Sequence, residues 1–333
     1  MKRVIFHIGL PKTATSTIQY TLLMNRTRLR EYGVRYPDRC VAYNTAESGH
    51  HNVPRQLVRP NLFDPQHGRI EELVAEVRQG AEATVVVSSE GLWNLALNRM
   101  DLFRDLIAQF AAVAEVEVVI TWRREDEHIE SLFLHALHTG QLGHSWAAYR
   151  KRAFKNIDRK YGNVVRIAER CEVAVRLQLY DRRTDPVEAF LRVVTGAEPP
   201  QLNHAKVTRN LRYGLNYYVC LYNAYPFQWP SRRPDFDLAR MSRKFVHRLT
   251  PRETRFRLLD ADGRTAILDQ AYNALRLWEG DGRITFDADR FRALWGETVH
   301  EPVRDLELNN LTAEEYDIFQ RVLDEEGRSA TGT

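Results

Sequence analysis

Residues 4–19 read VIFHIGLPKTATSTIQ and combine an apolar run, a turn and the start of a helical pattern. The apolar run is continuous rather than alternating, which is typical of a strand covered on both faces in a parallel sheet. The turn carries Pro11 and Lys12, and most of the residues that follow carry hydroxyl groups. A chain that leaves a strand, turns and enters a helix forms a nest whose free N–H groups can bind an anion. The stretch therefore predicts an α/β fold with a phosphate-binding loop.

The same design recurs along the first 200 residues. Further continuous apolar runs lie at residues 84–87, 116–122 and 173–179. Helical patterns alternate with them, at residues 16–32, 70–79, 102–114 and 125–138. This alternation is typical of βαβ units, so we expect a central parallel sheet flanked by helices in three layers. The polar residues that end the strands should then meet outside the carboxyl edge of the sheet, where such folds bind ligands.

The composition is that of a soluble globular protein, with 44% hydrophobic and 28% charged residues among 333. No apolar run approaches the roughly 20 residues of a membrane helix, and no cleavage site follows the first strand. We therefore expect no integral membrane segment and a cytoplasmic location. The net charge of +4 is too small to indicate nucleic-acid binding. The three cysteines are isolated from one another, which argues against a zinc site.

The loop differs from the P-loop G-x-x-x-x-G-K-[ST], whose final hydroxyl binds magnesium. Residues 9–17 have no second glycine, and Lys12 precedes the turn instead of following it. We therefore expect a ligand that carries a phosphate group and binds without a Walker-type magnesium ion.

Residues 10–17, LPKTATST, resemble the 5′-phosphosulfate loop P-K-[ST]-G-T-[ST] of sulfotransferases that use 3′-phosphoadenosine 5′-phosphosulfate (PAPS). In a second motif of that family, a strand ends in arginine and a serine follows eight positions later. Arg123 and Ser131 match this motif. The resemblance covers residues 3–135 and implies a P-loop NTPase-like fold. The late R-K-G-x-x-G segment of the cytosolic phenol branch is absent, so the chain is closer to the carbohydrate and bacterial branches.

The resemblance implies a PAPS-dependent sulfotransferase and assigns its site residues. Lys12 would neutralise charge on the oxygen that bridges phosphate and sulfate. The 3′-phosphate would be bound by Arg123 and Ser131. The 5′-phosphate would be bound by Thr13, Ala14, Thr15, Ser16 and Thr17, which together with Lys12 complete the cofactor-binding loop. Ala14 replaces the family's glycine, which requires a backbone conformation that alanine tolerates. The expected cofactor is PAPS as sulfate donor, with no metal.

Sulfuryl transfer to a hydroxyl also needs a base for the acceptor's proton. Glu90 follows the second strand and should open onto the same edge of the sheet. The alternative is that Glu90 only caps the helix beginning at Leu92. His50 and His51 are competing candidates on the acceptor side, because the cytosolic branch uses a histidine base. His7 falls within the first strand, where a hydrogen-bonded core histidine is the simpler interpretation.

The implied acceptor is a hydroxyl group of a carbohydrate or glycan. We expect residues 1–200 to form the PAPS-binding core and residues 201–333 a mostly helical extension that packs on it and is a candidate for acceptor binding. Two alternatives stay open. A P-loop-like nucleotide kinase would bind ATP with magnesium, and a noncatalytic nucleotide-binding protein would retain the fold alone.

Overall fold

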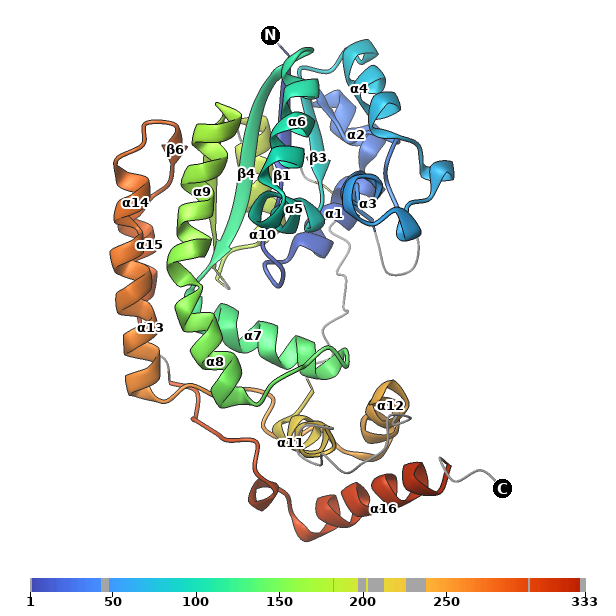
Figure 1. Ribbon diagram of the computed structural model, residues 1–333, viewed down its shortest axis with the longest axis vertical. Helices are drawn as coiled ribbons and strands as arrows, with labels where there is room; N and C mark the ends of the chain where they lie inside the picture. Colours follow the sequence, from blue (N-terminus) through green and yellow to red (C-terminus); the bar gives the residue numbers. More distant parts are fainter. Residues whose placement is uncertain are drawn as a thin grey trace. The chain divides into compact units, whose positions relative to one another are not determined.

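The computed structural model describes residues 2–42, 48–181, 183–196, 202, 213–225, 238–298 and 300–329. The chain divides into two compact units (Figure 1), which are described separately. Unit 1 comprises residues 1–124, 157–208 and 270–296, and unit 2 comprises residues 125–156, 209–269 and 297–333. This division differs from the predicted single boundary at residue 200, because residues 125–156 join unit 2 and residues 270–296 join unit 1.

Unit 1 is an α/β unit built on a six-stranded sheet in the order β2-β3-β1-β4-β5-β6. Every neighbouring pair of strands is parallel, as the continuous apolar runs predict. The strands are β1 (Arg3–His7), β2 (Val34–Arg35), β3 (Thr84–Ser88), β4 (Glu115–Arg123), β5 (Ala174–Tyr180) and β6 (Ile284–Thr285).

Helices cover both faces of this sheet. On one face, Ile5 packs with Ile18 of α1 and Leu191 of α10. On the other face, Phe6 meets Phe110 of α6 edge to face, with ring centroids 4.9 Å apart. The helices of unit 1 are α1 (Thr15–Met24), α2 (Arg26–Glu31), α3 (Asn52–Val58), η1 (Pro60–Leu62), η2 (Pro65–His67), α4 (Ile70–Gln79), α5 (Gly91–Asn98), α6 (Met100–Ala111), α9 (Ile157–Cys171), α10 (Pro186–Thr195), α14 (Arg276–Glu279) and α15 (Ala288–Gly296).

The position of β1 places its carboxyl end between those of β3 and β4. His7 at the end of β1 is in register with Ser88 on one side and Val119 on the other. The chain passes from β3 to β4 across β1, and the sheet grows in opposite directions from there. Ligands of open α/β sheets bind at such a reversal of strand order.

Unit 2 is helical. Its apolar core joins Phe133 of α7, Leu221 of α11, Phe245 of α12 and Phe319 of α16. Ion pairs between Lys244 and the neighbouring acidic residues of α16 link α12 to α16 at the surface. The helices are α7 (Glu125–His138), α8 (Trp146–Lys155), α11 (Leu215–Asn223), α12 (Leu238–Arg248), η4 (Leu308–Asn310) and α16 (Ala313–Ser329), and α13 (Ala261–Ala274) runs from unit 2 into unit 1.

Two local features depart from the sequence prediction. The single helix predicted at residues 16–32 is interrupted at Asn25, whose Nδ2 donates to the Thr21 carbonyl at 2.8 Å. An asparagine amide competes in this way with the helical backbone bonds. The prediction also missed β2 and β6, which have two residues each and are too short to give an apolar pattern. Among the helices of the described residues, none has the length and apolar character needed to cross a membrane.

Candidate functional site

The loop after β1 holds two non-glycine residues in the left-handed backbone region. Lys12 has a φ of 67°, and Ala14 has a φ of 63° with a ψ of 18°. This conformation costs an L-residue about 1 kcal/mol or more, whereas glycine adopts it freely. Ala14 therefore tolerates the loop conformation only at that cost. Other contacts must hold the loop in shape.

Two buried threonine hydroxyls provide such contacts. Thr13 Oγ1 donates to the Leu10 carbonyl at 2.6 Å, and Thr15 Oγ1 lies 3.3 Å from the same carbonyl. Both threonines are buried, whereas Ser16 is exposed and Thr17 is half-buried. The hydroxyls of Thr13 and Thr15 thus stabilise the loop conformation. The hydroxyls of Ser16 and Thr17 are more accessible.

His7 links three strands beneath the loop. Its Nδ1 lies 2.8 Å from Ser88 Oγ of β3, and its Nε2 lies 3.1 Å from Thr121 Oγ1 of β4. Burial lowers the pKa of the imidazole to about 3, so the ring is neutral. A Cβ on Gly9 would lie 3.0 Å from this ring and 2.8 Å from Thr15 Oγ1, so this position requires glycine. The prediction of a hydrogen-bonded core histidine is confirmed.

The amide groups of the loop are available to a ligand. Within the described parts of the chain, none of the N–H groups of residues 12–16 donates to a backbone carbonyl. The first turn of α1 contains no acidic side chain, and its N-cap residue, Ala14, makes no capping hydrogen bond through a side chain. Free amides at the positive end of a helix favour an anion.

The polar endings of β1, β3 and β4 come together in a group of three residues. We call this group, Lys12, Glu90 and Arg123, the loop cluster. Burial lowers the pKa of the Lys12 ammonium, the Glu90 charge raises it in part, and the Arg123 charge lowers it further. Burial raises the pKa of the Glu90 carboxyl, and the Lys12 charge and the Thr15 hydroxyl partly offset this. Between the described residues Lys12 and Glu90 no contact ion pair forms, so neither charge fully neutralises the other.

Glu90 occupies the N-cap position of α5 but makes no capping hydrogen bond through its side chain. The carboxyl group instead interacts with Lys12 and Thr15. In this structure the Glu90 side chain therefore does not cap the helix, as the alternative interpretation requires.

Arg123 is the last residue of β4 and is 8% exposed. Its Nη1 donates to the Lys12 carbonyl at 3.2 Å, which connects the end of β4 to the loop. Ser131 lies about two turns into α7, is half-buried and belongs to unit 2. The joint action of Arg123 and Ser131 on one phosphate group stays a prediction.

The two neighbouring histidines differ in environment. His50 is fully buried, accepts a hydrogen bond from the Ser88 amide at Nδ1 (3.1 Å) and lies against the Tyr36 ring. Burial lowers its pKa to about 3. His51 is half-buried and lies 3.0 Å from Ser89 Oγ, one residue before Glu90. Of the two, only His51 is accessible to an acceptor.

A second group of buried charges, which we call the α7 cluster, was not predicted from the sequence. Arg257 donates to Asp126 Oδ2 at 2.8 Å and to Glu130 Oε2 at 2.5 Å. The other oxygen of Glu130 accepts the backbone amides of Leu258 and Leu259, both at 2.8 Å. Asp126 and Glu130 are four positions apart on α7, a spacing that places two acids on one helix face and could have suggested a shared cation.

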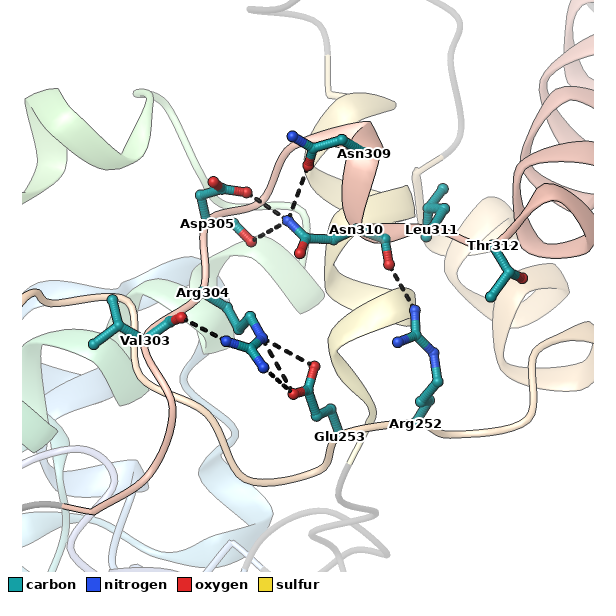
Figure 2. Close-up of a pocket in the computed structure, with 9 residues that line it drawn as sticks. All are labelled: Arg252, Glu253, Val303, Arg304, Asp305, Asn309, Asn310, Leu311 and Thr312. Atoms are coloured by element: carbon teal, nitrogen blue, oxygen red, sulfur yellow. Dashed lines mark hydrogen bonds and ion pairs between the residues drawn. The ribbon is translucent and has the colours of Figure 1, made fainter.

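A polar pocket of about 600 Å³ lies in unit 2 (Figure 2). Arg304 donates to both carboxylate oxygens of Glu253, and Arg252 donates to the Asn310 carbonyl at 2.6 Å and to Glu315. Both arginines of the pocket are thus paired with carboxylates. The lining residues, none of which the sequence predicts as a site residue, are Arg252, Glu253, Val303, Arg304, Asp305, Asn309, Asn310, Leu311 and Thr312.

The described residues contain no group of three or more His, Cys, Asp or Glu side chains arranged to hold a metal ion. A scan of protein-family models finds none that matches this chain, and a search of curated proteins finds no match. The function is therefore argued from the geometry of the loop.

Proposed function

We propose that this chain is a PAPS-dependent sulfotransferase with a P-loop NTPase-like core, acting on a hydroxyl group of a carbohydrate or glycan. The observation that carries the proposal is that Lys12 and Glu90 follow the ends of the neighbouring parallel strands β1 and β3, beside a loop with free amides. Transfer of a sulfuryl group to a hydroxyl needs a base for the acceptor and a cation for the leaving oxygen.

The residues of the loop fit an anionic nucleotide. The free amides of residues 12–16 and the accessible hydroxyls of Ser16 and Thr17 suit a 5′-phosphate. Lys12 and Arg123 supply two positive charges beside the loop. These charges would attract the phosphate groups of a bound nucleotide.

Two residues of the chain would carry the chemistry. Glu90 accepts the proton of the acceptor hydroxyl, and its raised pKa makes the carboxylate a stronger base than an exposed one. The Lys12 ammonium stabilises the negative charge that develops on the leaving oxygen. PAPS, when bound, would supply the sulfuryl group. His51 is half-buried and lies 3.0 Å from the hydroxyl of Ser89, the residue before Glu90, so it is the next candidate for the base.

Ligand-induced thermal stabilisation tests the proposal. The product nucleotide, 3′-phosphoadenosine 5′-phosphate (PAP), should raise the melting temperature in the presence of EDTA, because a ligand that binds only the folded chain stabilises it. ATP with magnesium should have little effect. Stabilisation by ATP with magnesium and not by PAP would favour the nucleotide kinase and refute the sulfotransferase.

A further inference from the structure

Tyr180 lies beside Arg123 where their two strands end. The strands β4 and β5 are parallel, and Arg123 is in register with Tyr180, the last residue of β5. The guanidinium Cζ of Arg123 lies over the Tyr180 ring, 5.3 Å from its centroid. At this distance the face of an aromatic ring attracts a cation. Arg123 is almost fully buried and Tyr180 is half-buried, so water screens this attraction only in part.

The same guanidinium also contacts the loop after β1. Its Nη1 donates to the carbonyl of Lys12, a residue held in the left-handed backbone region. Arg123 is thus held between the ring of Tyr180 and the backbone of Lys12. Fixing a free arginine side chain costs conformational entropy, and a side chain already fixed before the ligand arrives avoids that cost on binding.

We propose that Tyr180 is a positioning residue, whose ring face holds the Arg123 guanidinium where it binds a phosphate group of the nucleotide. This inference rests on the proposed function, in which Arg123 binds the 3′-phosphate. The ring face provides the attraction, so phenylalanine should replace tyrosine and an aliphatic side chain should not. If Tyr180 served only as packing, leucine would replace it and would affect all nucleotides alike.

The test compares two nucleotides that differ only in the 3′-phosphate. Dissociation constants of PAP and of adenosine 5′-phosphate are measured by calorimetry for the wild type, Tyr180→Leu and Tyr180→Phe. We expect the preference of the wild type for PAP to fall about threefold to tenfold in Tyr180→Leu and to stay within about twofold in Tyr180→Phe. A ratio of two affinities does not respond to a general loss of stability.

The chain offers a matched control. Arg69 lies over the Phe63 ring at the same distance, 5.3 Å, and neither residue belongs to the loop cluster. Phe63→Leu should leave the preference for PAP unchanged. A wild type that prefers PAP while Tyr180→Leu keeps the full preference would overturn the inference and leave the proposed function standing. A wild type that binds neither nucleotide would overturn both.

Discussion

The loop cluster in unit 1 and the α7 cluster in unit 2 hold the same kinds of charge in different ways. In the α7 cluster, Arg257 meets two carboxylates, and Glu130 also accepts two backbone amides. In the loop cluster, the Glu90 carboxyl group interacts with the Thr15 hydroxyl and, without a contact ion pair, with Lys12. The first arrangement satisfies its charges within the protein, whereas in the second Lys12 and Glu90 form no contact ion pair with each other.

The pKa values alone would not separate the two clusters. Burial raises the pKa of Glu130 as it raises that of Glu90. The two clusters differ in the hydrogen bonds that their carboxylates accept. A buried charge without such bonds lowers stability, and a buried charge with them is held in place. Poorly satisfied buried charges are retained where function requires them. We therefore expect removal of a charge to affect activity in the loop cluster and stability in the α7 cluster.

The largest expected effect is that of Glu90→Gln. Loss of the base should lower the rate of sulfate transfer by about 10²- to 10⁴-fold. The free energy of unfolding should change by less than about 1 kcal/mol or rise, because a poorly paired, half-buried carboxylate is replaced by a neutral group. Transfer rates and urea unfolding of the variant measure both quantities. Unimpaired transfer would move the search for the base to His51.

In the α7 cluster, Arg257→Met should leave the two carboxylates of Asp126 and Glu130 buried without their cation. We expect a loss of about 3–5 kcal/mol in the free energy of unfolding, measured by urea denaturation. Lys12→Met is the matched control in the loop cluster and should cost less than about 1 kcal/mol. Equal losses in the two variants would show that the clusters do not differ as we describe.

The pH dependence of transfer should reflect the displaced pKa values of the loop cluster. Activity should rise with pH as Glu90 ionises, and this limb should lie above the usual glutamate value of about 4.3 because burial raises the pKa. Activity should fall as Lys12 loses its proton, below the usual lysine value of about 10.4. The profile of kcat/KM against pH measures both limbs. An acidic limb that persists in the residual activity of Glu90→Gln would assign it to another group.

Glu90 also links stability to pH. Its pKa is raised in the folded chain, so the folded chain binds the proton more tightly than the unfolded chain does. Stability should therefore decline as the pH rises from the unfolded pKa to the folded pKa. Urea midpoints across this range should fall in the wild type, and that part of the decline should be absent from Glu90→Gln.

The smallest expected effect concerns the loop backbone. Ala14→Gly removes the left-handed penalty, which is offset in part by the greater freedom of glycine in the unfolded chain. We expect a gain of up to about 1 kcal/mol in stability, measured by thermal unfolding. Gly33→Ala is the reciprocal control, since Gly33 has a φ of 69° and no atom close to an added Cβ. A loss of stability in Ala14→Gly would mean that the loop does not strain Ala14.

The sheet could be predicted from the sequence because its four longer strands are continuous apolar runs, as at residues 116–122. The meeting of Lys12, Glu90 and Arg123 also follows from parallel strands whose carboxyl ends share one edge. The left-handed backbone conformation of Ala14 could not be predicted, because an alanine side chain does not indicate that conformation. The α7 cluster was missed because Arg257 lies more than 120 residues from Glu130 in the chain.

The contact of Arg123 with Tyr180 likewise depends on the register of β4 and β5. The apolar runs indicate that these strands exist, but they do not fix which residues stand side by side. The burial of His50 was also hidden, because its partners, the Ser88 amide and the Tyr36 ring, come from other elements.

The most direct test of whether the loop cluster binds an anionic ligand is a calorimetric titration with PAP in the presence of EDTA. The titration compares the wild type with Lys12→Met. We predict that the wild type binds PAP without metal and that Lys12→Met binds it at least about tenfold more weakly, the equivalent of about 1.4 kcal/mol. Equal affinities in the two proteins, or no binding by the wild type, would contradict the account.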